Sequence, residues 1–324
     1  TDDTPLAIGS LFIFDSQGPS KQKAITLAEK TIQIPGLKYL GARDVPVRDA
    51  TIPESVSANR PAIVQLIFSY TGGSETIERD LLRCRLQLRQ TYLENGLTVS
   101  ITALSTKLVS YKGLLTSPHF ADYYEDLLNP EFKSGIAIFH RRYSTNTYPN
   151  WALAQPFRML CHNGEINTIK TNKNAVSAYS RGLTPRPPGN DILTPGMSDS
   201  AALDEWVEHL VLEKGWSLLR AMRLTIPPAF EGEPDLWGQD AVDLLVYCRR
   251  AFGSLCAWDG PAGIIATDGR FLAGLVDRMG LRPVRWCSDE RGWLYIGSES
   301  GVFGLDPATI VASGQLQPGQ MIAL

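Results

Sequence analysis

Strand-like and helix-like segments alternate irregularly along this chain, and that order restricts the folds open to it. Residues 8–14 and 62–70 are short, rich in β-branched and aromatic residues and bounded by turn residues, which predicts buried strands. Residues 20–32 between them have helical spacing, and a longer amphipathic helix is predicted from Ser74 to Asn95-Gly96. This mixture favours a layered α+β fold over a parallel βαβ fold.

The remaining elements are predicted from the same periodicities. In the last third of the chain, four short strands separated by turn residues predict an antiparallel meander, at 262–267, 271–277, 284–286 and 293–298. Further strands are predicted at 98–104, 107–111 and 135–139, helices at 120–128, 204–213 and 240–252, strand plus loop at 41–61 and a loop at 181–196. We treat residues 1–324 as a single domain.

Composition excludes several classes of function. The net charge is −3, so the chain has no basic field for a nucleic acid. Its apolar runs are too short for a membrane span, and its acidic start is unlike a signal peptide. The five cysteines are odd in number and show no C-x-x-C spacing, which argues against a disulfide framework or a zinc site and favours a reducing, cytoplasmic location. Glycine-rich dinucleotide and P-loop motifs are absent from the sequence.

A polar block stands at residues 161–168, Cys-His-Asn-Gly-Glu-Ile-Asn-Thr. Few apolar residues surround it, so we predict a tight polar turn directed at a ligand and not a core strand. Asn163-Gly164 alone is also typical of a type I′ hairpin turn. Cys161 next to them is expected to be a buried structural thiol, and the alternative is a replacement nucleophile.

Several motifs follow one another in this part of the chain. They are Arg142-Tyr143-Ser144-Thr145-Asn146-Thr147, Leu153-Ala154-Gln155-Pro156-Phe157-Arg158, the block from His162, Ser198-Asp199-Ser200, Trp258-Asp259-Gly260-Pro261-Ala262 and Asp277-Arg278-Met279-Gly280-Leu281-Arg282-Pro283. Together they resemble the glutamine amidotransferase domain of the glutamate synthase large subunit, a class II amidotransferase with an N-terminal nucleophile. The resemblance implies the four-layer αββα sandwich of N-terminal-nucleophile hydrolases, incomplete here at its N-terminus.

The resemblance also implies roles for individual residues. Arg142 would hold the α-carboxylate of L-glutamine and Asp199 its ammonium, through charge-assisted hydrogen bonds. The side-chain amide of Asn163 and the backbone N–H of Gly164 would form the oxyanion hole. Thr145 and His162 are expected to support the site. Asp199 alternatively caps the helix that begins nearby.

The family's nucleophile is an N-terminal Cys whose own α-amine is the base. Thr1 does not correspond to that residue, and Leu6–Phe14 resembles a segment well inside the domain. We therefore expect the opening segment to be absent and the chain alone to be hydrolytically inactive; Thr1 as a nucleophile is the disfavoured alternative.

The resemblance implies a larger parent. Its synthase domain would carry FMN and an iron–sulfur cluster, and its partners would include a small subunit or ferredoxin, whereas this chain itself would bind no cofactor or metal. In a photosynthetic eukaryote the location would be the plastid stroma. Two other hypotheses stay open: a non-catalytic glutamine-binding module, and a class II amidotransferase with another acceptor, against which the extension Glu165-Ile166-Asn167-Thr168 argues.

Overall fold

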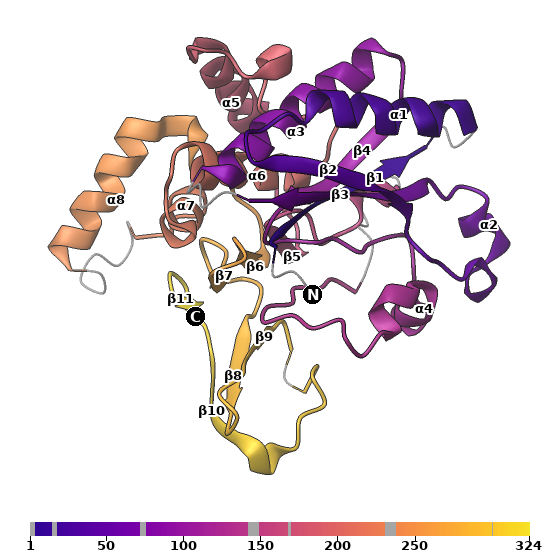
Figure 1. The fold of residues 1–324 in the computed structure, drawn as a ribbon. Helices are drawn as coiled ribbons and strands as arrows, with labels where there is room; N and C mark the ends of the chain where they lie inside the picture. The colour runs from indigo at the N-terminus through magenta and orange to yellow at the C-terminus, as the bar shows by residue number, and fades with distance from the viewer. Residues whose placement is uncertain are drawn as a thin grey trace. The chain divides into compact units, whose positions relative to one another are not determined.

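A computed structural model gives the fold and describes residues 4–14, 18–71, 76–141, 149–167, 170–230, 238–299 and 301–324 (Figure 1). It contains α-helices and antiparallel sheets, which confirms the α+β class. The chain divides into two compact units, which are taken in turn. Over the described part of the chain, no helix is long and apolar enough to cross a bilayer.

Unit 1 is built on a four-stranded antiparallel sheet of order β2-β3-β1-β4. Alternate residues of β3, among them Val64 and Leu66, are buried in one cluster with residues of α1 and α3, which lie side by side over this face (Figure 1). Ile63 belongs to a second cluster on the opposite face, as the period of two in a strand requires. The strands are β1 (Leu6–Ile13), β2 (Leu37–Asp44), β3 (Ala62–Tyr70) and β4 (Val99–Ser105); the helices are α1 (Gly18–Thr31), α2 (Glu54–Ser57), α3 (Ile77–Glu94) and α4 (Ser117–Tyr123), with 3-10 turns at Asp49–Thr51, Glu125–Leu128, Trp151–Leu153 and Pro188–Asn190.

Two predicted strands of this unit are wrong. The chain leaves the sheet at the end of β4, because side chains capture the N–H groups that a strand at 107–111 would need. Ser105 Oγ accepts from the N–H groups of Lys107 and Leu108 (2.9 and 3.1 Å), and Glu78 Oε1 accepts from Thr106 N–H at 2.8 Å. Residues 135–139 are also not a strand in the structure, although their side chains alternate in exposure, because an alternating pattern alone supplies no partner strand.

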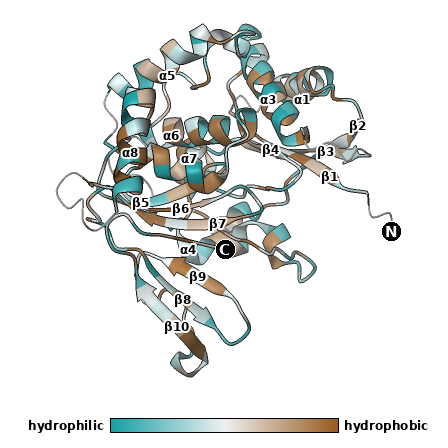
Figure 2. Ribbon diagram, turned by 90° about the vertical axis from the view of Figure 1, so that its left-hand side faces the viewer, coloured by the Kyte–Doolittle hydropathy of each residue, from teal (hydrophilic) through white to brown (hydrophobic). Residues whose placement is uncertain are grey.

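Unit 2 contains a sheet of order β11-β7-β6-β5, with α6 and α7 over it (Figure 2). Its centre is apolar: Ile264 and Ala266 of β6 and Leu275 of β7 are fully buried. The strands are β5 (Leu160–Gly164), β6 (Ala262–Thr267), β7 (Leu272–Val276) and β11 (Met321–Ala323); the helices are α5 (Lys170–Gly182), α6 (Asp199–Glu208), α7 (Leu218–Thr225) and α8 (Gln239–Phe252), with a π-helical turn at His209–Glu213 and a 3-10 turn at Gly253–Leu255.

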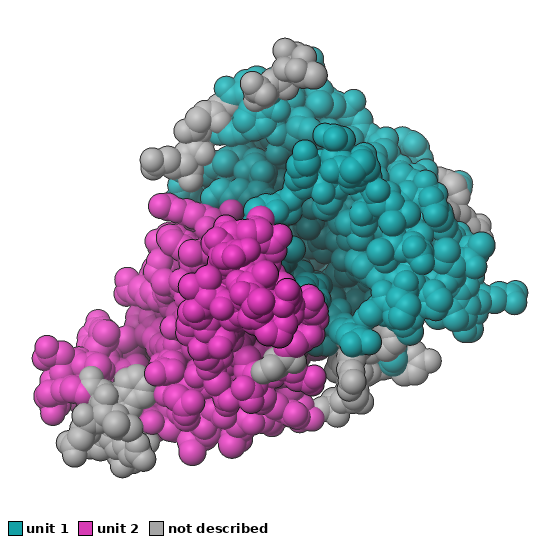
Figure 3. All heavy atoms as spheres, turned by 90° about the horizontal axis from the view of Figure 1, so that it is seen from below, with its two compact units in different colours: residues 1–158, 183–192 teal, residues 159–182, 193–324 magenta. Residues whose placement is uncertain are grey.

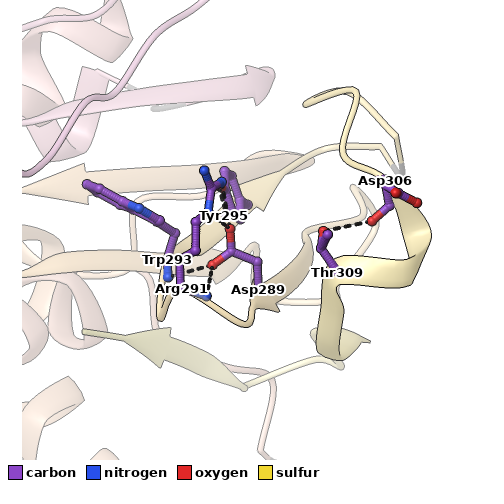
Figure 4. Close-up of polar contacts among 6 residues, drawn as sticks. All are labelled: Asp289, Arg291, Trp293, Tyr295, Asp306 and Thr309. Atoms are coloured by element: carbon purple, nitrogen blue, oxygen red, sulfur yellow. Dashed lines mark hydrogen bonds and ion pairs between the residues drawn. The ribbon is translucent and has the colours of Figure 1, made fainter.

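A second sheet of unit 2 has the order β10-β8-β9 and shows that the predicted meander is split. The β6–β7 and β8–β9 hairpins are confirmed, but β7 pairs with β11 and β8 with β10. The carboxylate of Asp289 fixes the β8–β9 turn by accepting hydrogen bonds from the Arg291 guanidinium, the Tyr295 hydroxyl and the N–H of Trp293 (Figure 4). The bounds are β8 (Arg285–Asp289), β9 (Leu294–Gly297) and β10 (Ile310–Gln315), with a 3-10 turn at Pro307–Thr309.

The two units interleave along the sequence. Unit 1 consists of residues 1–158 and 183–192, and unit 2 of residues 159–182 and 193–324 (Figure 3). Most of the candidate site residues therefore fall in unit 2, which contains β5, α5 and α6, so the contacts among these elements can be described.

Candidate active site

The polar block begins as a strand, so its prediction as a turn throughout is wrong. Leu160–Gly164 forms β5, which pairs with β6 from Leu160↔Ala266 to Gly164↔Ala262. Cys161 and His162 are buried, whereas the side chain of Asn163 is exposed. Because Asn163 and Gly164 are both paired within the sheet, they do not form a two-residue hairpin turn, and that alternative is excluded.

The chain then docks by its backbone onto the segment before β6. Glu165 N–H donates to the carbonyl of Pro261 at 3.1 Å, and Asn167 N–H donates to the carbonyl of Asp259 at 2.7 Å. Gly164 has φ +116°, and a Cβ there would overlap the Pro261 carbonyl oxygen and lie 3.0 Å from its carbon. Gly260, with φ +147°, meets the carbonyl of Glu165 in the same way. Both positions thus require glycine for the approach of one backbone to another.

The register of β5 sets the direction of the Gly164 N–H. Glu165 N–H reaches Pro261 O and Thr267 N–H reaches Met159 O (2.7 Å), so odd-numbered residues of this segment form the hydrogen-bonded pairs with β6. The N–H groups of even-numbered residues point away from β6. Among the described strands β5 lies at the edge of its sheet, so the Gly164 N–H is directed outward, beyond the sheet.

Helix α6 holds β5 at two points. Asp204 Oδ1 accepts from the N–H groups of Met159 and Leu160 at 2.8 and 3.2 Å. Nε2 of His162 lies 2.6 Å from Ser200 Oγ, one helical turn before Asp204. The second contact joins the residue before Asn163 to the residue after Asp199. This position suits the supporting role expected for His162.

Asp199 is the first residue of α6, and the cap of that helix is Ser198. The Ser198 hydroxyl accepts from the Ala201 N–H at 3.2 Å, so the interpretation of Asp199 as the cap is wrong. The carboxylate of Asp199 instead makes an ion pair with Lys173 of α5, where Nζ and Oδ1 are 2.5 Å apart. The same Nζ donates to the carbonyl of Met197 at 3.3 Å.

Cys161 has the character of a structural thiol. Its side chain is buried in β5, and burial raises its pKa to about 12. Since the thiolate is the nucleophilic form, this environment opposes the alternative in which Cys161 attacks a substrate.

Sequence reasoning missed two neighbouring residues of α5. The amide of Asn172 is buried and donates to the carbonyls of Ser254 and Cys256, at 2.9 and 3.1 Å, just before the segment on which the turn docks. Lys173, next to it, reaches Asp199. The available signal was the polar run Thr171-Asn172-Lys173-Asn174, but no helix was predicted there, so the two side chains could not be assigned to faces.

Two predicted site residues, Arg142 and Thr145, lie outside the described residues, and their roles stay predictions. Within the described ranges, no group of three or more His, Cys, Asp or Glu side chains is placed to hold a metal ion.

Comparison with known proteins identifies the family. The model for class II glutamine amidotransferases matches residues 1–324. The chain is 34% identical to the glutamate synthase [NADPH] large chain of Azospirillum brasilense, in an alignment that covers 99% of this chain and 22% of that protein. It is 35% identical to the chloroplastic ferredoxin-dependent glutamate synthase of Oryza sativa subsp. japonica (100% of this chain, 20% of that protein) and 34% identical to ferredoxin-dependent glutamate synthase 2 of Synechocystis sp. (100% and 21%).

The chain thus spans about a fifth of the length of these relatives and is homologous to their glutamine amidotransferase region. The fold, the motifs and the match over all 324 residues agree: the chain belongs to the class II glutamine amidotransferases.

Proposed function

We propose that this chain is the glutaminase domain of a glutamate synthase, which binds L-glutamine and hydrolyses its side-chain amide to glutamate and ammonia. The ammonia would pass to a synthase domain, with FMN and an iron–sulfur cluster, that aminates 2-oxoglutarate. The relatives are named glutamate synthases, which supports an acceptor whose amination yields glutamate. That residues 1–324 act as one domain is part of the proposal.

The outward N–H of Gly164 is the observation that carries the proposal. Attack on an amide carbonyl produces a tetrahedral intermediate whose oxygen is negatively charged, and donors directed at that oxygen stabilise it. Gly164 offers a backbone donor at the edge of the sheet, and the exposed side chain of Asn163 precedes it. Loss of one such donor costs about 3 kcal/mol of transition-state stabilisation.

Asp199 supplies the anion for the substrate ammonium in this proposal. The contact of His162 with Ser200 links β5 to the start of α6, so the strand that carries Gly164 and the helix that begins with Asp199 are joined within unit 2. Arg142 remains the predicted partner of the substrate carboxylate.

A non-catalytic glutamine-binding module is the second candidate, and the environment of four of the chain's five thiols favours it. Burial raises the pKa of Cys161 and Cys256 to about 12, and it also raises the pKa of Cys84 and Cys248. A glutaminase would therefore need a nucleophile other than these four thiols.

Calorimetric titration with L-glutamine tests the binding half of the proposal. The chain should bind L-glutamine in preference to D-glutamine, and Asp199→Asn should weaken binding roughly tenfold or more because the acceptor for the substrate ammonium loses its negative charge. Asp243→Asn, an exposed carboxylate of α8, is the matched control and should bind as the wild type does. Equal affinity of the Asp199→Asn variant and the wild type would refute the assignment.

Hydrolysis is tested in the natural polypeptide that carries this sequence. Asn163→Ala should lower the rate of ammonia release about 100- to 1000-fold and leave KM for L-glutamine nearly unchanged, because the lost donor acts mainly in the transition state. A rate within threefold of the wild type would remove Asn163 from the oxyanion hole. Absence of ammonia release by the wild type itself would favour the binding-module hypothesis.

A further inference from the structure

Lys173 holds the carboxylate that the proposed function reserves for the substrate. Its ammonium lies 2.5 Å from Asp199 Oδ1 and 3.3 Å from the carbonyl oxygen of Met197. The first acceptor begins α6, and the second lies in the loop just before that helix. A cation from α5 is therefore held by the start of α6.

An ammonium group on a lysine and the α-ammonium of an amino acid have the same chemistry: three N–H donors, one positive charge and no acceptor. The acceptors that Lys173 uses are thus those that an amino-acid substrate would need. A substrate ammonium that shared Asp199 with Lys173 would place two positive charges on one carboxylate, which weakens binding of the substrate.

We propose that Lys173 is a built-in competitor for the substrate ammonium and sets the affinity of this site for amino-acid amides. This inference rests on the proposed role of Asp199. L-Glutamine binds only after Lys173 has moved from Asp199, whereas an amide acid without an α-ammonium does not compete with Lys173.

The surroundings of Lys173 suit such an exchange. The side chains of Lys173 and Asp199 are 32% and 40% exposed, so the lysine ammonium has water available to it when it leaves the pair. The adjacent Asn172 is buried and fixed to the carbonyls of Ser254 and Cys256. Asn172 thus anchors α5 beside Lys173, and the exchange that we propose involves the Lys173 side chain alone.

The size of the effect follows from the exposure of the pair. A partly exposed ion pair contributes at most about fivefold to an equilibrium, and removal of the competing cation should return this factor to the substrate. Lys173→Met keeps the length and helix propensity of the side chain and removes its charge. Lys170→Met, at the exposed start of the same helix, is the matched control.

The test is calorimetric titration of the wild-type chain and both variants with L-glutamine and with glutaramate, which has a hydrogen atom in place of the α-ammonium. Lys173→Met should bind L-glutamine about three- to fivefold more tightly than the wild type, with the affinity for glutaramate unchanged within twofold. Lys170→Met should match the wild type for both ligands.

Each outcome decides a different question. Equal or weaker binding of L-glutamine by Lys173→Met overturns the competition, and so does an equal gain for glutaramate, which would indicate a general change of the site. Failure of both the wild type and Lys173→Met to bind L-glutamine overturns the proposed function and this inference with it. Circular dichroism of each variant confirms that α5 is retained.

Discussion

Replacement of Gly164 by alanine tests the geometry at the end of β5. The backbone there has φ +116°, which an L-residue adopts at a cost of about 1–3 kcal/mol. The new Cβ would also overlap the carbonyl oxygen of Pro261. Relief of this overlap moves β5 away from the segment before β6 and breaks the hydrogen bonds from Glu165 to Pro261 and from Asn167 to Asp259.

These two hydrogen bonds contribute about 1 kcal/mol each, so Gly164→Ala should lower the free energy of unfolding by about 3–5 kcal/mol. Urea denaturation followed by circular dichroism measures the change. Gly182→Ala is the matched control, because a Cβ at Gly182 meets no atom within 4 Å and its φ lies outside the left-handed region. If Gly164→Ala were within 1 kcal/mol of the wild type, the close backbone approach at this strand would be wrong.

Three further predictions concern buried polar groups of unit 2. Burial lowers the pKa of His209 from 6.5 to about 4, so between these values the unfolded state binds more protons and the free energy of unfolding falls as the pH drops. Through this residue the chain should lose about 2 kcal/mol of stability between pH 7 and pH 5, and urea titrations of His209→Phe should lack that loss. Asn172→Ala leaves the carbonyls of Ser254 and Cys256 without their amide donor, and we expect a loss of about 1–3 kcal/mol in the same assay; a change under 0.5 kcal/mol would contradict this. Cys161 should resist a glutamine-analogue electrophile in the native protein because burial raises its pKa to about 12; a mass-spectrometric adduct on Cys161 would show that the thiol is reactive.

The sequence pattern located the elements that are rich in buried apolar residues. The strand predicted at 62–70 is β3, which is a nearly continuous apolar run, and the long helix predicted from Ser74 is α3, whose apolar residues recur at helical spacing. Strand β5 was missed because it is an edge strand without an alternating apolar pattern. Its pairing with β6 and the hydrogen bond from its first residue to Asp204 of α6 hold it in place. The strands β10 and β11 were also not predicted.

The motifs predicted which residues form the site, but not the contacts that these residues make. The resemblance indicated Asn163, Gly164 and Asp199, and the family assignment is confirmed. The Lys173–Asp199 ion pair was not predictable, since it joins two helices that are far apart in sequence and depends on how α5 and α6 pack. The requirement for glycine at position 164 has a sufficient cause in the structure, the close contact with Pro261, which the sequence alone did not reveal.

A crystal structure of this chain with L-glutamine tests the central claim most directly. The account predicts that the side-chain carbonyl oxygen of the ligand lies about 3 Å from the Gly164 nitrogen and the Asn163 side-chain nitrogen, in the position of an oxyanion. It also predicts the α-ammonium on Asp199, with Lys173 moved away. Glutamine bound elsewhere on the chain, or bound with its carbonyl oxygen directed away from the Gly164 N–H, would contradict the account.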